Sequence, residues 1–230
     1  MRLLGYRKET ERVKKKGLRI LAAAAVLTFG CLTMNAYAAE GWALSNNIWT
    51  YLDKNGNRVT NEWKKGADNL WRYLNSSGEM AVNSWADNDY YVDSNGIMVS
   101  NKWMQLASPY SRDNGTTYWF YFGSSGKVTK DTWKKIDGKS YYFDTDGIMQ
   151  TGWQNVNGNW YYLNSKGAMQ TGWLLKEGKY YFLNTDGTMA YGWVNTQGNW
   201  YYFQKPDGEM LTNAYAPDGR YVNAEGGLIQ

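Results

Sequence analysis

The chain has 230 residues, with 25 Lys and Arg against 21 Asp and Glu, a formal charge of +4 at pH 7. It contains no His and one Cys, which excludes imidazole bases, internal disulfides and the commonest transition-metal ligands. Aromatic side chains make up 17% of the residues, and 13 of them are Trp. We therefore expect aromatic contacts, rather than ionisable groups, to carry the function.

Residues 1–38 have the pattern of a secretory signal peptide. A strongly basic segment comes first, and an apolar run follows from Leu18 to Met34. Ala36-Tyr37-Ala38 supplies small residues at alternate positions, which predicts cleavage after Ala38. A retained anchor is the weaker alternative, because a spanning helix needs about 20 apolar residues. Lipidation at Cys31 is a minor alternative, since Thr28-Phe29-Gly30 fits such sites poorly.

Removal of this segment changes the charge of the chain. Eight basic and two acidic side chains leave with it, so residues 39–230 carry a formal charge of about −2. The basic patch that nucleic-acid binding requires is lost, and no nucleic-acid partner is expected. The remaining chain has neither Cys nor His, and no cofactor or metal is expected.

An internal repeat with a period near 20 residues runs through residues 39–230. Its leading position is Trp42, Trp63, Trp85, Trp103, Trp133, Trp153, Trp173 and Trp193, and then Tyr215 in a shortened last copy. The other five Trp begin a four-residue aromatic block of the type Trp160-Tyr161-Tyr162-Leu163; they are Trp49, Trp71, Trp119, Trp160 and Trp200. All 13 Trp therefore occupy two positions of one repeat.

Each repeat predicts a β-hairpin: the aromatic block, a polar turn that ends in Gly, and a short second strand. The turn glycines are Gly56, Gly78, Gly96, Gly126, Gly147, Gly167, Gly187 and Gly208. A single hairpin is marginal in water, so the copies must stack on their neighbours. The predicted fold is all-β, a β-solenoid of about eight to nine stacked aromatic hairpin repeats.

Side chains alternate across a strand, so Trp160 and Tyr162 share one face of the block while Tyr161 and Leu163 share the other. One face can pack along the axis of the solenoid and the other is left for ligands. Some of the aromatic side chains must form the core. Purely structural hairpins could use Val and Ile equally well, which favours a ligand-binding role for the rest.

The pattern G-W-x(6)-W-Y-Y-L-x(3)-G-x-M-x-T-G-W, from Gly152 to Trp173, resembles the choline-binding repeat of Gram-positive cell-surface proteins. The resemblance covers residues 41–230. It implies that a secreted chain attaches noncovalently to the cell surface, with choline-bearing teichoic acid or another cell-wall polymer as its partner. Related repeats occur in streptococcal glucan-binding proteins and in clostridial toxin tails, so α-glucan is the alternative ligand.

In that family the ligand cage lies between consecutive hairpins. The resemblance implies that its walls are the leading Trp and first block aromatic of one repeat, the third block aromatic of the next, and often a Met after the turn. The implied cages are Trp42, Trp49 and Tyr73; Trp63, Trp71, Met80 and Tyr91; Trp103, Trp119 and Tyr142; Trp153, Trp160, Met169 and Phe182; Trp173, Tyr180, Met189 and Tyr202; and Trp193, Trp200, Met210 and Tyr221. The repeats that begin at Trp85 and Trp133 have Asp89 and Ser140 as first block residues, and weak or absent binding is expected there.

Aromatic cages suit a quaternary ammonium group, which cannot donate conventional hydrogen bonds. Each cation–π contact contributes about 0.5 to 2 kcal/mol, so single sites should be weak. Several sites that face a polymer with many choline groups would attach firmly through effective concentration.

Three other interpretations remain open. Sugar rings also stack on Trp and Tyr, with polar neighbours such as Asn155 and Asn195 to fix hydroxyl groups. An adhesin or scaffold could use the inserted loop at 104–118 to meet a partner. An enzyme is not expected, because the acidic residues are typical of turns and no pair with glycosidase geometry stands out. The last copy, around Tyr215, could be a cap or a surface for homodimer formation.

Overall fold

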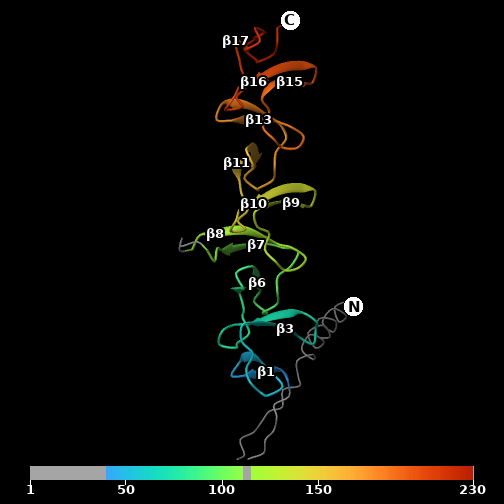
Figure 1. The fold of residues 1–230 in the computed structure, drawn as a ribbon, viewed down its shortest axis with the longest axis vertical. Helices are drawn as coiled ribbons and strands as arrows, with labels where there is room; N and C mark the ends of the chain where they lie inside the picture. The colour runs from blue at the N-terminus through green and yellow to red at the C-terminus, as the bar shows by residue number, and fades with distance from the viewer. Residues whose placement is uncertain (1–39, 111–114, 230) are drawn as a thin grey trace, which may run out of the picture. The chain divides into compact units, whose positions relative to one another are not determined.

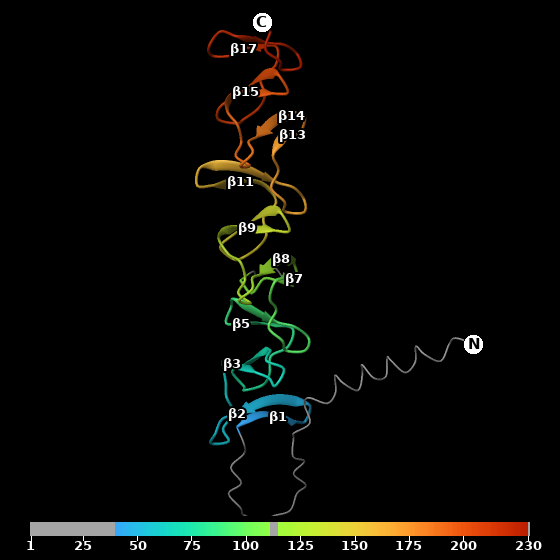
Figure 2. The same ribbon diagram turned by 90° about the vertical axis from the view of Figure 1, so that its right-hand side faces the viewer.

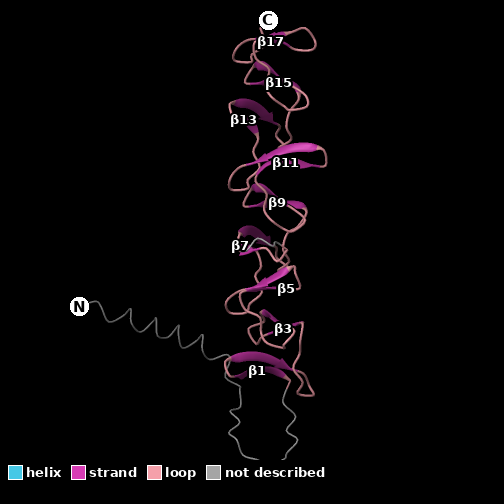
Figure 3. Cartoon of the chain, turned by 90° about the vertical axis from the view of Figure 1, so that its left-hand side faces the viewer, coloured by secondary structure: helices cyan, strands magenta, loops and turns pink. Residues whose placement is uncertain are grey.

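The computed structural model describes residues 40–110 and 115–229, and its regular elements are β-strands (Figure 1). None of these described residues forms a helix (Figure 3), which confirms the all-β prediction. In particular, they include no helix with the length and apolarity to cross a membrane. The predicted signal peptide, residues 1–38, lies outside the described residues.

The strands pair in chain order, each with its neighbour in sequence, as antiparallel two-stranded sheets. The pairs are β1 (Gly41–Ser45) with β2 (Ile48–Leu52), β3 (Glu62–Lys65) with β4 (Trp71–Leu74), β5 (Ser84–Ala86) with β6 (Tyr90–Val92), β7 (Lys102–Ala107) with β8 (Thr117–Phe122), β9 (Thr132–Ile136) with β10 (Lys139–Phe143), β11 (Gly152–Val156) with β12 (Asn159–Leu163), β13 (Gly172–Lys176) with β14 (Lys179–Leu183), β15 (Gly192–Thr196) with β16 (Asn199–Phe203), and β17 (Ala214–Tyr215) with β18 (Tyr221–Val222).

The described chain forms two compact units. The first runs to Lys102 and also includes Phe122–Val128, so it holds β1 to β6. The second contains Trp103–Tyr121 and the chain from Thr129 onward, with β9 to β18 and most of β7 and β8. Within the second unit, consecutive hairpins are turned relative to each other. The β11–β12 hairpin lies broadside in Figure 2, where β13–β14 is seen nearly end-on, and Figure 1 shows the reverse.

The hairpins are built differently from the prediction, because the partner strand precedes the aromatic block instead of following it. Trp153 lies opposite Tyr162 in the β11–β12 pair. Asn157 and Gly158 form the turn with φ of 53° and 83°, as a two-residue hairpin turn requires. The segment after the block, predicted as the second strand, makes one bridge, from Leu163 to Met169. An Asn-Gly pair between two apolar runs is a hairpin signal that the prediction passed over.

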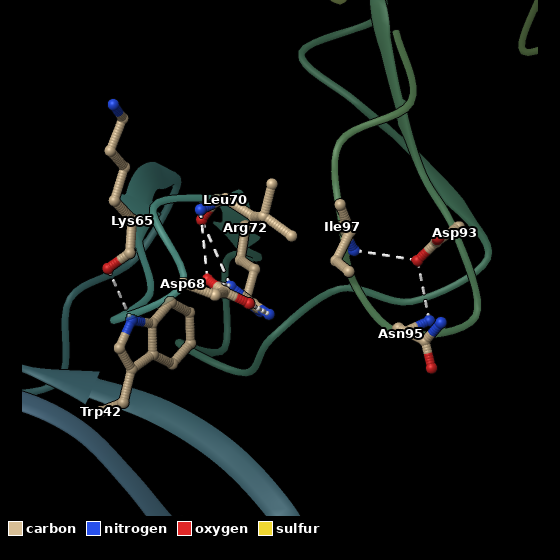
Figure 4. A network of polar contacts seen from close by, with 8 residues as sticks. All are labelled: Trp42, Lys65, Asp68, Leu70, Arg72, Asp93, Asn95 and Ile97. Atoms are coloured by element: carbon tan, nitrogen blue, oxygen red, sulfur yellow. Dashed lines mark hydrogen bonds and ion pairs between the residues drawn. The ribbon is translucent and has the colours of Figure 1, made fainter. Parts of the chain in front are cut away.

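The predicted turn glycine belongs to a loop after the block, and this loop has its own hydrogen-bond pattern. The Asp93 carboxylate accepts hydrogen bonds from the amides of Asn95 at 2.8 Å and Ile97 at 3.0 Å (Figure 4). Gly96 has a φ of 71°, which confirms the positive φ predicted for it. The side chain at the same place does likewise in other repeats, at Asp53, Asn75, Asp144 and Asn164. The loop is therefore closed by its own first residue.

Outside the first hairpin, where Leu52 is half-buried, the fourth position of each block supplies fully buried side chains to the core. These side chains are at most 1% exposed: Leu74, Val92, Phe122, Phe143, Leu163, Leu183, Phe203 and Val222. Because side chains alternate along a strand, one buried residue per hairpin leaves the first block aromatic free of the core. Five of the six aromatic residues at that first position are exposed in the described chain, with 37% for Trp160 and 46% for Tyr180, whereas Trp49 is half-buried.

The predicted insertion at 104–118 is partly strand. β7 continues to Ala107 and β8 begins at Thr117, so its two ends lengthen a hairpin instead of forming a free loop. Within it, Tyr110 accepts a hydrogen bond from the Lys130 ammonium at 2.7 Å. Residues 111–114 lie outside the described residues.

The burial of the fourth block position predicts that two leucines of neighbouring hairpins contribute very differently to stability. Leu163→Ala should lower the free energy of unfolding by about 2 to 5 kcal/mol, because Leu163 is fully buried. Leu175→Ala is the control, since Leu175 is 57% exposed, and it should cost about 0.5 kcal/mol or less. Urea unfolding followed by Trp fluorescence measures both. Equal losses would contradict this description of the core.

Candidate functional site

Four pockets among the described residues share one plan. The leading aromatic and first block aromatic of one hairpin form two walls, and the second block Tyr and the Met of the following repeat complete them. They are lined by Trp63, Trp71, Tyr90 and Met98; by Trp103, Trp119, Tyr141 and Met149; by Trp153, Trp160, Tyr181 and Met189; and by Trp173, Tyr180, Tyr201 and Met210. We call these four the aromatic boxes and name each by its leading Trp. Their volumes are about 320 Å³ for the Trp63 and Trp153 boxes, 360 Å³ for the Trp103 box and 560 Å³ for the Trp173 box.

The Trp153 box shows the geometry of the walls. The rings of Trp153 and Trp160 are 6.5 Å apart and stand at 88° to each other. The ring of Tyr181, from the next hairpin, lies 5.0 Å from Trp153 at 66°. In the Trp103 and Trp173 boxes the leading and first block rings stand at 82° and 89° to each other. The second block Tyr of the next hairpin lies 5.0 Å from Trp103 and 4.7 Å from Trp173. In these three boxes the leading and first block rings therefore meet at nearly a right angle.

A backbone hydrogen bond places the Met of each box. The Met189 amide donates to the Trp160 carbonyl at 2.7 Å, which brings the segment after the loop of one repeat against the block of the repeat before. The same bond recurs at 2.7 to 2.9 Å, from Met80 to Trp49, Met98 to Trp71, Met149 to Trp119, Met169 to Ser140 and Met210 to Tyr180. The Met of one repeat therefore lies against the aromatic block of the preceding repeat, and in the four boxes it lines the pocket.

The structure brings some residues of each expected cage together and places others elsewhere. Leading and first block aromatics of one hairpin meet in the boxes, whereas the third block aromatics do not line them. Phe182 lies opposite Trp173 in its own hairpin, with ring centres 5.5 Å apart. The others likewise face the leading aromatic of their own hairpin: Tyr73, Tyr91, Tyr142, Tyr202 and Tyr221.

Strand alternation explains this correction. The third block residue points to the same side as its own leading Trp, so the second and fourth block residues are the ones that face the previous hairpin. Phe203, a fourth block residue, lies 5.7 Å from the Trp173 ring. The Met residues also differ from the expected cages, because each Met amide bonds to the block of the preceding repeat. Met169 sits against Ser140, Met189 lines the Trp153 box, and Met210 lines the Trp173 box. Met80 bonds to Trp49, in the hairpin before the one predicted. Which of these residues hold a ligand remains a prediction.

The expected first and last cages have Arg as their second block residue. At the first, Arg72 makes two hydrogen bonds to the Asp68 carboxylate, at 2.9 and 2.6 Å (Figure 4). This contact holds the pKa of Asp68 down at about 2. The indole N–H of Trp42 donates to the Lys65 carbonyl at 3.0 Å. At the last, the guanidinium of Arg220 lies over the Trp193 ring.

The two positions expected to bind weakly also differ from the boxes. Asp89 forms an ion pair with Lys127 at 3.1 Å and its carbonyl accepts from the Val128 amide, so a Val stands where boxes have Met. Ser140 offers no ring beside Trp133, although Tyr161 approaches Trp133 to 4.8 Å. Both sites lack one aromatic wall.

Carboxylates border three of the boxes. The Trp153 box has Asp207 and Glu209 in its lining, and the Trp173 box has Glu225. In the Trp63 box, Asp87 accepts hydrogen bonds from the Trp63 indole at 2.9 Å and the Tyr73 hydroxyl at 2.8 Å. Burial, and then this bond, raises the pKa of Tyr73 to about 12.

The Trp103 box is lined instead by Lys166 and Ser165. Within the residues that the structure describes, no cluster of three or more Asp, Glu, Cys or His could hold a metal.

Models of known repeat families match most of the chain. A family model of the choline-binding repeat matches residues 39–85, 150–186 and 176–215, and a second model with the same description matches 79–110. A model of a cell wall binding repeat matches 131–149. The chain therefore belongs to the choline-binding repeat family, as the resemblance implied.

Solved structures of pneumococcal proteins are similar in fold. The modular autolysin LytC from Streptococcus pneumoniae is 31% identical with a TM-score of 0.65, over 82% of this chain and 42% of LytC. Its complex with a synthetic peptidoglycan ligand gives the same values. Choline binding protein F from the same organism, in complex with ipratropium, is 35% identical with a TM-score of 0.62, over 79% of this chain and 63% of that protein.

The chain spans about two fifths of the length of LytC. No curated protein sequence shows significant similarity to the chain.

Because a Met side chain packs against the turn glycine, we expect substitution by Ala to destabilise the fold more at Gly208 than at Gly198. Gly208 and Gly198 both have positive φ, of 73° and 83°, so Ala strains the backbone at either. A Cβ on Gly208 would lie 2.5 Å from the Met189 sulfur, whereas one on Gly198 would meet nothing within 4 Å. Gly208→Ala should therefore lower the unfolding free energy by about 1 kcal/mol or more beyond Gly198→Ala, measured by urea unfolding. Equal effects would mean that Met189 does not pack there.

Proposed function

We propose that this chain attaches noncovalently to the bacterial cell surface by binding choline groups of a wall polymer in its aromatic boxes. The observation that carries the proposal is the exposure of the first block aromatics, which form box walls yet stay out of the core. Trp71, Trp119, Trp160 and Tyr180 are 37 to 46% exposed. A purely structural role would bury rings of this size, because each buries a large apolar area when packed.

The chemistry of the boxes fits a quaternary ammonium group. Ring faces attract a cation through their quadrupole, and the Met thioether adds polarizable apolar contact. The carboxylates of Asp207 at the Trp153 box and Glu225 at the Trp173 box would add long-range attraction for a cation, whereas Glu209 is paired with Lys179. A neutral sugar would gain no such long-range attraction.

The repetition of the boxes would supply the strength of attachment. Each box offers a few cation–π contacts of about 0.5 to 2 kcal/mol, so a single choline should be held weakly. Consecutive boxes on one chain would engage a polymer with many choline groups, and each later contact benefits from a high effective concentration. We propose that the hairpins stack as a β-solenoid of about eight to nine repeats, which would line the boxes up along the polymer.

The related proteins support the same ligand class. Choline binding protein F carries choline binding in its name, and its complex with ipratropium holds a quaternary ammonium compound. The secretion that surface attachment requires would come from the predicted signal peptide, residues 1–38.

We propose binding without catalysis for residues 39–230. The acidic side chains that an enzyme would need have structural roles in turns. Asp144, for example, accepts hydrogen bonds from the amides of Asp146 and Ile148 at 3.0 and 2.8 Å. LytC is an autolysin, but this chain matches only 42% of its length.

Two tyrosines at the same repeat position test the proposal. Tyr181→Ala removes a wall of the Trp153 box and should abolish choline binding there, which lowers the bound choline per chain by about one. Tyr161→Ala is the matched control, because Tyr161 faces the site that has Ser140 in place of a ring, and it should leave the bound choline unchanged. Equilibrium dialysis with labelled choline measures both variants against the unaltered chain.

Ligand identity is tested with the same proteins. Choline should quench or shift the Trp fluorescence in a saturable way, whereas dextran at equal monomer concentration should not. Saturable binding of dextran without any response to choline would replace choline by α-glucan. Equal loss of choline from both Tyr variants would refute the assignment of the walls.

A further inference from the structure

The last hairpin boundary contains a box whose third wall is an arginine. Tyr215 lies opposite Tyr221 as each leading residue lies opposite its third block residue, so Arg220 occupies the second block position. In the four boxes that position is a Tyr. The rest of this box is present. Trp193 and Trp200 stand at the leading and first block positions, and the Leu228 amide donates to the Trp200 carbonyl at 2.8 Å, with Leu in place of Met.

The guanidinium of Arg220 lies on the ring that a ligand would use. Its central carbon is 4.0 Å from the centre of the Trp193 ring. A guanidinium at this distance makes the same cation–π contact that a quaternary ammonium makes.

Asp218 holds both partners in place. Its carboxylate accepts hydrogen bonds from Arg220 Nε at 2.9 Å and Nη2 at 2.6 Å, and from the Trp193 indole N–H at 2.7 Å. The Arg220 side chain keeps the pKa of Asp218 down at about 2, so the carboxylate is ionised at neutral pH. One carboxylate therefore fixes the cation and the ring edge together.

The first hairpin boundary offers an independent parallel. Arg72 stands at the second block position that follows Trp42 and Trp49, and it is also held by a carboxylate, that of Asp68 (Figure 4). The position thus carries a Tyr at each of the four boxes and an Asp-bound Arg at these two boundaries.

We propose that Arg220 is an internal cation that fills the Trp193–Trp200 box, so that this box takes no choline in the native chain. Arg220 is then a specificity-determining residue, and it limits the number of ligand sites. The proposal rests on the proposed function, because it assumes that the other boxes bind a quaternary ammonium group. A tethered cation competes at a high effective concentration with a weakly bound free ligand, so millimolar choline does not displace it.

Arg220→Tyr tests the proposal by restoring the wall that the four boxes have. The probe is choline chloride, added to the ¹⁵N-labelled full chain, and the readout is each indole N–H signal in the NMR spectrum. Trp193→Phe and Trp153→Phe assign the two signals of interest. Arg58→Tyr is the control for an added tyrosine, since Arg58 is exposed and lies in another unit.

In the unaltered chain the Trp153 signal should shift with choline while the Trp193 signal stays fixed. In Arg220→Tyr both should shift, with choline affinity at Trp193 raised about tenfold or more, and Arg58→Tyr should behave as the unaltered chain. If Arg220→Tyr does not fold, Arg220→Gln removes the cation with less change of shape, and it should give a weaker shift at Trp193.

Two results would overturn the proposal. One is a Trp193 shift in the unaltered chain at the choline concentration that shifts Trp153. The other is a silent Trp193 in a folded Arg220→Tyr whose Trp153 still responds. A silent Trp153 in the unaltered chain would instead refute the proposed function, and the two failures are therefore distinguishable.

Discussion

The backbone hydrogen bond between the segment after one loop and the aromatic block of the preceding repeat is the contact on which the boxes depend. A two-stranded hairpin cannot satisfy its outer edge or bury a core alone. The bond from the Met189 amide to the Trp160 carbonyl satisfies part of that edge, and it fixes where the next hairpin stands. The same bond brings Met189 and Tyr181 to Trp153. The contact that joins consecutive hairpins therefore also assembles the box, and each box needs two intact repeats.

Charge distinguishes boxes that share one geometry. The Trp153 box is bordered by acidic side chains, the Trp103 box by Lys166, and the Trp193 ring already carries a guanidinium. Since a quaternary ammonium group is recognised by weak cation–π contacts, nearby charges are large enough to decide whether a box fills. Unequal boxes on one chain follow from substitutions in the loops and at the second block position, while the backbone keeps the same form.

The class of fold, and the pair of residues that form the first two walls of each box, could be predicted from the sequence. The spacing of Trp153 and Trp160 identified residues that do lie 6.5 Å apart, and the glycine after the block has the positive φ predicted for it. The strand that pairs with the aromatic block was predicted on the wrong side of it. The prediction paired the block with the segment that follows it, whereas the Asn157-Gly158 turn joins the block to the strand before it. The third wall was misplaced because it depends on how consecutive hairpins are stacked. Alternation showed that Tyr181 and Phe182 face opposite sides, but only the hydrogen bonds between hairpins show which side meets Trp153.

A crystal structure of residues 39–230 grown with saturating choline would show whether the boxes hold the ligand. We expect density for choline between the rings of Trp153, Trp160 and Tyr181, and at the corresponding place in the other three boxes. Choline bound only outside the four boxes, or well-ordered boxes that remain without choline, would refute the assignment.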